Sequence, residues 1–432
     1  MILEMISTGE EVLSGQITDT NATWISAAFA ERGVAMSYRV TVGDRLEALA
    51  TTFKQRARQA DVVIVNGGLG PTSDDLSAAA AALALGEDLV EHSDWHEALK
   101  AKFARLDRIM DPANLKQAML PRSAEILDNP IGTACGFAIE LDGAAFFFTP
   151  GVPSEMKRMV REQIFPSLEK RFGLAPASWL QRLHCFGVSE SRLGRLLDEI
   201  VLDPQVTLGF RAHLPTIEIK IMGKGADGAE VRDHMQATAR EIRDRIGENI
   251  IAEGDHGIAG YLQDLMVAGG HTLALAESCT GGMAASDLVE MPGSSAYFDR
   301  SFVTYSNRAK TEMLGVPPQL IETHGAVSLE TAREMARGAR LRAAVSHALA
   351  ISGVAGPDGG TEDKPVGTVA FALATPQHLF SQVLRTPKWG RSHIRRIAAA
   401  AALDMLRRHL TGQPVFGNYD LSKRIREEQI AI

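Results

Sequence analysis

The feature that most limits the possible folds is an alternation of short apolar strands with helices in two long stretches of the chain. Its clearest example is the run Asp61–Asn66, whose four central residues are Val, Val, Ile and Val. A glycine-rich segment, 67–71, follows at once, and a helical segment near 74–85 comes next. An unbroken apolar run of this kind is typical of a parallel strand buried on both faces. Residues 1–168 and 258–412 therefore each predict an α/β fold with a parallel sheet covered on both sides.

The chain is also too long for one hydrophobic core. At 432 residues, two or three domains are the natural expectation. Segment 172–178 has the composition of a linker, and 253–257 is a second break. Between them, 179–252 is expected to alternate strand, helix, two strands, helix and strand, which indicates a small α+β module. We therefore expect four parts, which are domains 1–171, 172–253 and 254–413 and a polar tail, 414–432.

Composition excludes several classes of protein. The formal net charge of −8 makes a general nucleic-acid binder unlikely, since such proteins are usually basic. Cys135, Cys185 and Cys279 lie far apart, which indicates a reducing compartment rather than a disulfide framework. The amino-terminus lacks the basic head and apolar run of a signal peptide, and no 18-residue apolar stretch is present. We expect a cytoplasmic protein that does not interact with membranes.

The segment 276–282 is the first candidate for chemistry. It follows a short apolar strand, 272–275, and precedes a predicted helix that begins at Met283. Ser278 lies there in a turn that contains two glycines. Its hydroxyl and the backbone N–H groups of the turn can contact the carbonyl group of a substrate or an anion. A serine nucleophile needs a base, and the sequence offers His324 or, if burial lowers its pKa, Lys310. Cys279 is a competing nucleophile, although many cysteines are only small buried fillers.

The second candidate is the glycine-rich loop after the strand 61–66. Glycines let backbone N–H groups approach a phosphate, and the adjacent carboxylates of Asp74 and Asp75 suit a hard divalent cation. The equally weighted alternative is a tight turn in which Asp74 caps a helix. Glu10 and Glu11, with Asp19 and Asn21, could complete an oxygen-rich site there. The strand that ends at Pro150–Gly151, just before a helix start, could also bind an anion.

Together these motifs resemble one family. Gly67–Asp75, Asp19–Asn21 and Pro150–Met156 resemble the amino-terminal, molybdopterin-binding-like domain of the CinA (competence/damage-inducible protein A) family. The carboxyl-terminal half resembles its nicotinamide-nucleotide amidohydrolase domain through Glu277–Gly282, 292–295, 305–310, 324–328, 353–357 and 364–368. The resemblance implies a three-layer α/β domain at each end and a KH-like module between them.

The resemblance also implies activities and partners. The carboxyl-terminal domain would hydrolyse the carboxamide of nicotinamide mononucleotide (NMN) without a cofactor. The amino-terminal domain would cleave ADP-ribose with a divalent metal, and the protein would be a homodimer. The implied catalytic residues are Ser278, Lys310, Tyr305 and Arg391. The implied substrate-binding residues are Cys279, Thr280, Gly281, Gly282, Ser294, Ser295, Asn307, Gly353, Gly356, Gly67, Gly68, Gly70, Thr72, Pro150 and Gly151, and the implied metal ligands are Asp74, Asp75 and Glu10.

Three questions stay open at the level of sequence. The oxyanion of an amide hydrolysis could be held by N–H groups near Thr280–Gly282 or by those of the loop 353–356. The family usually has Gly-Asp-Glu where this chain has Gly9-Glu10-Glu11, so the metal geometry there is in question. The amino-terminal domain could instead bind a nucleotide or a pterin without converting it, as a sensor or interaction platform.

Overall fold

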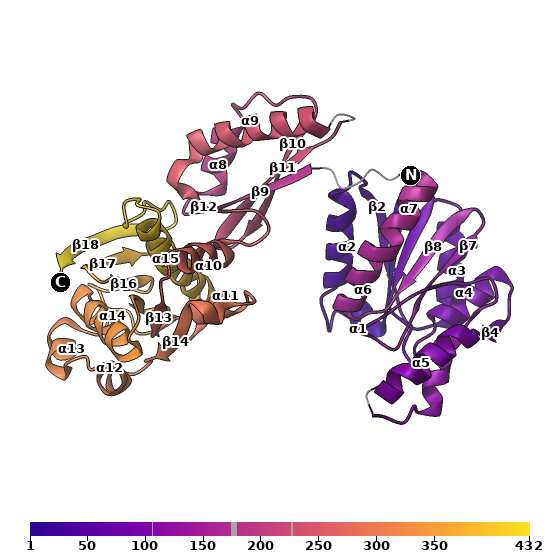
Figure 1. The fold of residues 1–432 in the computed structure, drawn as a ribbon, viewed down its shortest axis with the longest axis horizontal. Helices are drawn as coiled ribbons and strands as arrows, with labels where there is room; N and C mark the ends of the chain where they lie inside the picture. Colours follow the sequence, from indigo (N-terminus) through magenta and orange to yellow (C-terminus); the bar gives the residue numbers. More distant parts are fainter. Residues whose placement is uncertain (106, 174–178, 226–227) are drawn as a thin grey trace. The chain divides into compact units, whose positions relative to one another are not determined.

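The structure is a computed structural model that describes residues 1–105, 107–173, 179–225 and 228–432. It divides into two compact units, which meet in sequence at residues 178 and 179, and each is described separately below (Figure 1). The expected linker 172–178 falls mostly on residues 174–178, which lie outside the described residues.

The first unit is built on a six-stranded sheet. In sheet order the strands are β2 (Met36–Val42), β1 (Leu3–Thr8), β3 (Val62–Asn66), β8 (Ala144–Thr149), β7 (Gly136–Leu141) and β6 (Glu125–Leu127). The first four are parallel, as the apolar runs predict, whereas β7 pairs antiparallel with β8 and β6 pairs antiparallel with β7. The ends of β1, β3 and β8 therefore lie side by side, and the loops after them share one edge of the sheet.

Helices cover both faces of this sheet (Figure 1). Alternate residues of each strand point to opposite faces, so Val63 and Val65 pack into one core and Val62 and Ile64 into another. The helical segments are α1 (Glu10–Leu13), α2 (Thr20–Ala30), α3 (Leu46–Ala57), α4 (Ser77–Leu85), α5 (Ser93–Arg105), η1 (Pro112–Ala118), α6 (Pro153–Met159), η2 (Val160–Ile164) and α7 (Phe165–Phe172). A small ladder joins β4 (Leu89–Glu91) to β5 (Met119–Pro121).

The second unit begins with the α+β module expected from the sequence. Its four-stranded antiparallel sheet has the order β10 (Val206–His213), β11 (Thr216–Gly223), β9 (Trp179–Phe186) and β12 (Ile250–Glu253). Every second residue of β11 is buried, because one face of the sheet packs on the helices and the other does not. The helices are α8 (Glu190–Leu197), α9 (Gly228–Ile246) and the short η3 (Gly247–Asn249).

The rest of the second unit is a three-layer domain around another six-stranded sheet. Its order is β14 (Phe298–Val303), β13 (Leu273–Glu277), β15 (His347–Gly353), β16 (Thr368–Ala374), β17 (His378–Arg385) and β18 (Lys423–Ala431). Leu273 and Leu275 face the core shared with α15, whereas Ala274 and Ala276 face the core shared with α14. The helices are α10 (Ile258–Ala268), α11 (Met283–Val289), η4 (Ser294–Ala296), α12 (Asn307–Leu314), α13 (Pro318–His324), α14 (Leu329–Ala343) and α15 (Arg391–Leu410).

The prediction of a polar tail at 414–432 is wrong. Residues Lys423–Ala431 form β18, which pairs antiparallel with β17 at the edge of the sheet. The preceding segment folds back over the α+β module, where the ring of Tyr419 packs 4.9 Å from that of Phe186. An edge strand is half exposed and carries charged side chains, so its sequence resembles that of a tail.

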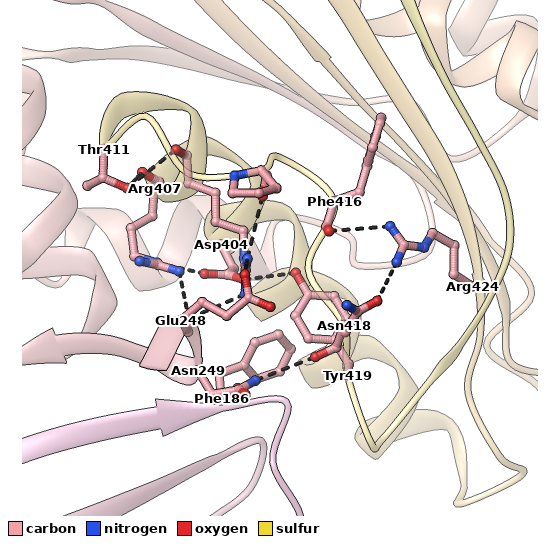
Figure 2. Close-up of polar contacts among 12 residues, drawn as sticks. Phe186, Glu248, Asn249, Asp404, Arg407, Thr411, Phe416, Asn418, Tyr419 and Arg424 are labelled. Atoms are coloured by element: carbon pink, nitrogen blue, oxygen red, sulfur yellow. Dashed lines mark hydrogen bonds and ion pairs between the residues drawn. The ribbon is translucent and has the colours of Figure 1, made fainter. Parts of the chain in front are cut away.

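A buried polar cluster fastens this segment and the α+β module to α15 (Figure 2). The carboxylate of Asp404 accepts hydrogen bonds from Arg407 and Arg408, each at 2.7 Å, and from the Tyr419 hydroxyl at 2.8 Å. Arg408 also donates to the carboxylate of Glu248 at 2.6 Å. Both arginine side chains are almost fully buried, whereas the Glu248 side chain is 40% exposed, so the module is anchored to a buried arginine through a partly exposed carboxylate.

Membrane-spanning helices are not found among the described residues. None of the helices there is both long enough and apolar enough to cross a bilayer.

Candidate active site

Ser278 lies on a turn at the carboxyl end of β13, an interior strand of its sheet. Its N–H donates to the carbonyl of Ile351 at 2.9 Å and so continues the pairing of β13 with β15. Gly281 and Gly282 have φ angles of +59° and +90°, which only glycine adopts without strain. The chain therefore turns sharply after Ser278 and enters α11, so the Ser278 side chain lies at the end of the strand.

Lys310 meets this serine from the first turn of α12. Its Nζ lies 3.1 Å from Ser278 Oγ and donates to the Thr304 carbonyl at 3.0 Å. The side chain is 1% exposed. Burial disfavours the charged ammonium and lowers the pKa of Lys310 to about 8, although the nearby Cys279 opposes this slightly. About one tenth of the amine is therefore neutral at pH 7 and can accept the serine proton, compared with less than about 1% for an ordinary lysine.

Local packing fixes α12 at that distance. Ser306 caps the helix by accepting a hydrogen bond from the Ala309 N–H at 3.0 Å. At its other end the helix lies so close to α14 that a Cβ at Gly338 would come within 2.0 Å of the Leu314 carbonyl oxygen. Glycine at position 338 thus permits the close contact that holds the helix carrying Lys310.

A cleft of about 260 Å³ opens over the serine and the lysine. Its mouth carries Arg391, which donates to the Gly356 carbonyl at 2.7 Å and to the Tyr305 hydroxyl at 2.9 Å. Of the residues expected from the sequence, Ser278, Lys310, Tyr305, Arg391, Cys279, Asn307, Gly353 and Gly356 line the cleft. Arg391 is therefore not an isolated surface arginine, because it joins the loop 353–356 to Tyr305.

Other expected residues do not line this cleft. Thr280 is fully buried, and the N–H of Gly282 donates to the Glu277 carboxylate at 3.0 Å. Ser294 and Ser295 stand in η4, beyond the far end of α11. The residues that the structure places outside the cleft are Thr280, Gly281, Gly282, Ser294 and Ser295.

The competing base lies outside the cleft, and the competing nucleophile borders it as an unreactive thiol. His324 ends α13 and faces Glu330 at 3.9 Å instead of the cleft. Cys279 borders the cleft but is buried, and burial raises the pKa of its thiol to about 12. Because the thiolate is the nucleophilic form, such a thiol is nearly inert at neutral pH. The geometry thus pairs Ser278 with Lys310.

Two residues that hold the nucleophile turn were missed from sequence. The Glu277 carboxylate accepts hydrogen bonds from backbone N–H groups at the start of α11. Arg395 donates to the carbonyls of Cys279 at 3.1 Å and Thr280 at 2.6 Å. Arg395 follows Arg391 by four positions on α15 and therefore shares its face, so helical spacing from Arg391 is the signal that could have found it.

The first unit has a larger cavity, of about 560 Å³, at the carboxyl edge of its sheet. The expected residues Gly67, Gly68, Gly70, Asp74, Asp75, Asp19, Asn21, Pro150 and Gly151 all line it. Thr72 does not line it. Its N–H and its hydroxyl donate hydrogen bonds to the Asp75 carboxylate at 2.9 and 2.6 Å. One carboxylate oxygen of Asp75 therefore stabilises the turn. The helix cap that the alternative interpretation assigned to Asp74 is not formed, because α4 begins at Ser77 without a side-chain cap.

The acidic residues of this cavity differ from those expected. Glu11 lines the cavity, whereas Glu10 does not, because its carboxylate packs over Gly43. Asp44, which the sequence did not single out, also lines the cavity. Burial and the charges of Glu11, Asp74 and Glu10 raise the pKa of Asp44, against an opposing hydrogen bond from the Glu10 N–H. The carboxylates that line the cavity are thus those of Glu11, Asp19, Asp44, Asp74, Asp75 and Glu155, and Asp44 is repelled by Glu11 and Asp74 among them.

The described residues do not by themselves assemble a complete metal site. Over the described ranges, no group of three or more His, Cys, Asp or Glu side chains is arranged to hold a metal ion. The carboxylates present fit only the mode in which one or two of them bind Mg²⁺ and the substrate phosphates and waters complete the shell.

Family models match the chain in three consecutive segments. Residues 4–170 match a probable molybdopterin binding domain, 181–252 match the KH domain of damage-inducible protein CinA, and 255–410 match the CinA carboxyl-terminal domain. A crystal structure of a competence/damage inducible protein from Agrobacterium tumefaciens is 42% identical and covers 35% of this chain and 93% of its own, with a TM-score of 0.35.

Curated relatives match over nearly the full length. A CinA-like protein of Shewanella denitrificans is 49% identical over 98% of this chain and 100% of its own length. A protein of Shewanella oneidensis named nicotinamide-nucleotide amidohydrolase PncC is 49% identical over 97% of this chain and 98% of its own. The order of the three matched domains and these full-length similarities agree, and the chain belongs to the CinA family.

Proposed function

We propose that the carboxyl-terminal domain hydrolyses the carboxamide of NMN to nicotinate mononucleotide and ammonia. The observation that carries the proposal is the 3.1 Å approach of the buried Lys310 amine to Ser278 Oγ at the base of a cleft. The name of the Shewanella oneidensis relative supports the choice of substrate. Pairing a hydroxyl with a nearby neutral amine is a recognised way to activate a serine.

The residues suggest a reaction in two halves. Neutral Lys310 accepts the Ser278 proton while Oγ attacks the carboxamide carbon and forms a C–O bond. The lysine ammonium then returns the proton to the leaving nitrogen, the C–N bond breaks, and ammonia departs. In the second half, Lys310 takes a proton from water, the hydroxide attacks the ester carbon, and the acid product leaves as Ser278 is reprotonated. In both halves the Thr304 carbonyl accepts a hydrogen bond from the Lys310 amine, which keeps the amine turned toward the serine.

We place the oxyanion at the loop 353–356 instead of the start of α11. The N–H of Gly281 donates to the Ser278 carbonyl at 3.1 Å, and that of Gly282 is taken by Glu277. In contrast, the backbone hydrogen bonds of the described residues leave the N–H groups of Ala355 and Gly356 without an acceptor, and both residues line the cleft. One such donor contributes about 3 kcal/mol to the stabilisation of a transition state.

Arg391 is our candidate for the substrate phosphate. Its guanidinium stands at the mouth of the cleft, and Tyr305 and the Gly356 carbonyl orient it. Planar N–H pairs suit phosphate oxygens. An Arg391→Lys variant should therefore raise the KM for NMN.

The test is ammonia release from NMN by the purified full-length chain with a chelator present. We expect nicotinate mononucleotide and ammonia in equal amounts, and no detectable turnover by Ser278→Ala. Cys279→Ala is the matched control beside it and should retain activity. Full activity of Ser278→Ala together with loss in Cys279→Ala would reverse the assignment of the nucleophile.

For the first unit we propose metal-dependent cleavage of ADP-ribose to AMP and ribose 5-phosphate. The observation that favours it is the cavity in which the loop 67–70 faces the mutually repelling carboxylates of Glu11, Asp44 and Asp74. A divalent cation bound there would supply charge neutralisation for a diphosphate. We expect AMP to form with Mg²⁺ and to disappear with chelator or in Asp74→Asn. Tight binding of ADP-ribose with no product would favour the sensor alternative.

A further inference from the structure

Glu277 is the last residue of β13 and the immediate neighbour of Ser278. Its side chain is fully buried. One carboxylate oxygen accepts the N–H groups of Gly282 at 3.0 Å and Ala284 at 3.2 Å. The other accepts the N–H of Ala285 at 2.9 Å and the hydroxyl of Ser301 at 3.3 Å.

These four donors explain how a carboxylate is tolerated in the interior. A buried charge is costly unless hydrogen bonds and opposite charge compensate it. Here the N–H groups at the start of α11 supply both the bonds and the partial positive charge. The start of that helix is consequently occupied by a group of the protein itself, so it is not where a substrate anion binds.

The bonds also bridge the nucleophile turn. Glu277 precedes Ser278, and three of its four donors come from residues that follow the turn. On the outer side, Arg395 holds the carbonyls of Cys279 and Thr280. The backbone that carries Ser278 is thus fixed from both sides, while the lysine opposite is fixed by α12.

We propose that Glu277 is a positioning residue of the amide hydrolysis, which holds the turn so that Ser278 Oγ stays opposite Lys310 Nζ. The inference rests on the proposed function for its substrate. It differs from a simple helix-capping role in what it predicts, because loss of a cap lowers stability whereas loss of position lowers the rate of the chemical step in protein that is still folded.

The test is Glu277→Gln, which keeps the size of the side chain but turns an NH₂ group toward backbone N–H donors. We expect kcat for NMN to fall by about 10²-fold with KM nearly unchanged, since a displacement of about 1 Å can cost that much. The pH midpoint of the rate should stay that of wild type, because the charges that shift the pKa of Lys310 do not include Glu277. A folded variant with wild-type kcat would overturn the proposal.

Ser346→Ala is the matched control. Ser346 joins the opposite end of the same strand through hydrogen bonds with Thr272 at 2.8 and 3.0 Å, far along β13 from the serine. This variant should lose stability and keep kcat. If the two variants lose activity equally, in proportion to their unfolded fractions, Glu277 is only structural.

A second measurement separates this proposal from the choice of substrate. The rate at which a fluorophosphonate labels Ser278, followed by peptide mass spectrometry, requires no NMN. Slower labelling in folded Glu277→Gln supports the positioning role even if wild type does not hydrolyse NMN, and an unchanged rate contradicts it. If Glu277→Gln does not fold, Ser301→Ala, which removes one of the four donors, decides the question by the same labelling rate.

Discussion

The side chain of Lys310 is buried beside Ser278, and this burial has a measurable consequence. Only the neutral amine can take the serine proton, and burial lowers its pKa to about 8. We therefore expect kcat/KM for NMN to rise about tenfold per pH unit below that value and to level off above it. The measurement is a pH–rate profile of ammonia release, checked for enzyme stability at each pH.

The control at this position is Lys310→Arg, which keeps a positive charge that is not lost near neutral pH. It should be inactive at every pH tested, because a guanidinium does not act as a base there. A flat wild-type profile between pH 6 and pH 9 (roughly the window around the expected midpoint), or an active arginine variant, would rule out the lysine as the base.

Some residues of both sites could be predicted from the sequence and others could not. Ser278 stands in a turn that a strand, two glycines and a helix start mark clearly. By contrast, Glu10 and Glu11 are neighbours on α1, and successive residues of a helix point about 100° apart. Only the packing of Glu10 over Gly43 decides which of the two faces the cavity. The part played by Glu277 was equally hidden, since it depends on N–H groups of a helix that begins six residues later.

At the scale of elements, predictions succeeded where the hydrophobic pattern is local. The strands and helices of the α+β module follow one another in the order that the sequence predicts. The strand β18 was missed, because an antiparallel edge strand is specified by its partner more than by its own pattern. In β18 most residues are exposed and charged, so nothing local distinguishes them from a tail.

Deletion of residues 423–432 tests whether β18 is part of the domain. Its removal exposes the hydrogen-bonding edge of β17, which includes buried Leu379 and Phe380. We expect lower stability of the second unit and self-association, because unpaired edges recruit other chains. Thermal unfolding and size-exclusion chromatography measure the two effects. Unchanged unfolding and elution would mean that the strand contributes nothing.

The buried cluster at the end of α15 makes a second prediction at this scale. Asp404→Asn removes the charge that compensates Arg407 and Arg408, both of which are buried. Breaking a buried pair in this way costs about 3–5 kcal/mol of unfolding free energy. Chemical denaturation measures it, and Glu162→Gln, which removes an exposed ion pair with Arg158, is the control with an expected loss below about 1 kcal/mol. Equal, small losses of unfolding free energy in both variants would show that the cluster does not stabilise the contact between α15 and the module.

For the whole molecule, the two candidate sites belong to different units. The residues that line the larger cavity all lie between 7 and 155, and those that line the serine cleft lie between 278 and 391. Residues 179–432 expressed alone should therefore release ammonia from NMN at the wild-type rate. Residues 1–173 alone should release none, and a fragment 179–432 that folds but is inactive would show that the first unit is needed for catalysis.

Rapid-quench mass spectrometry of the full-length protein during turnover of NMN tests the central claim most directly. We predict an ester between the substrate acyl group and Ser278, found in the peptide that contains this residue and absent from Ser278→Ala. Trapping with hydroxylamine should remove the adduct and regenerate the free serine. An adduct on Cys279, or steady ammonia release by Ser278→Ala, would contradict the account.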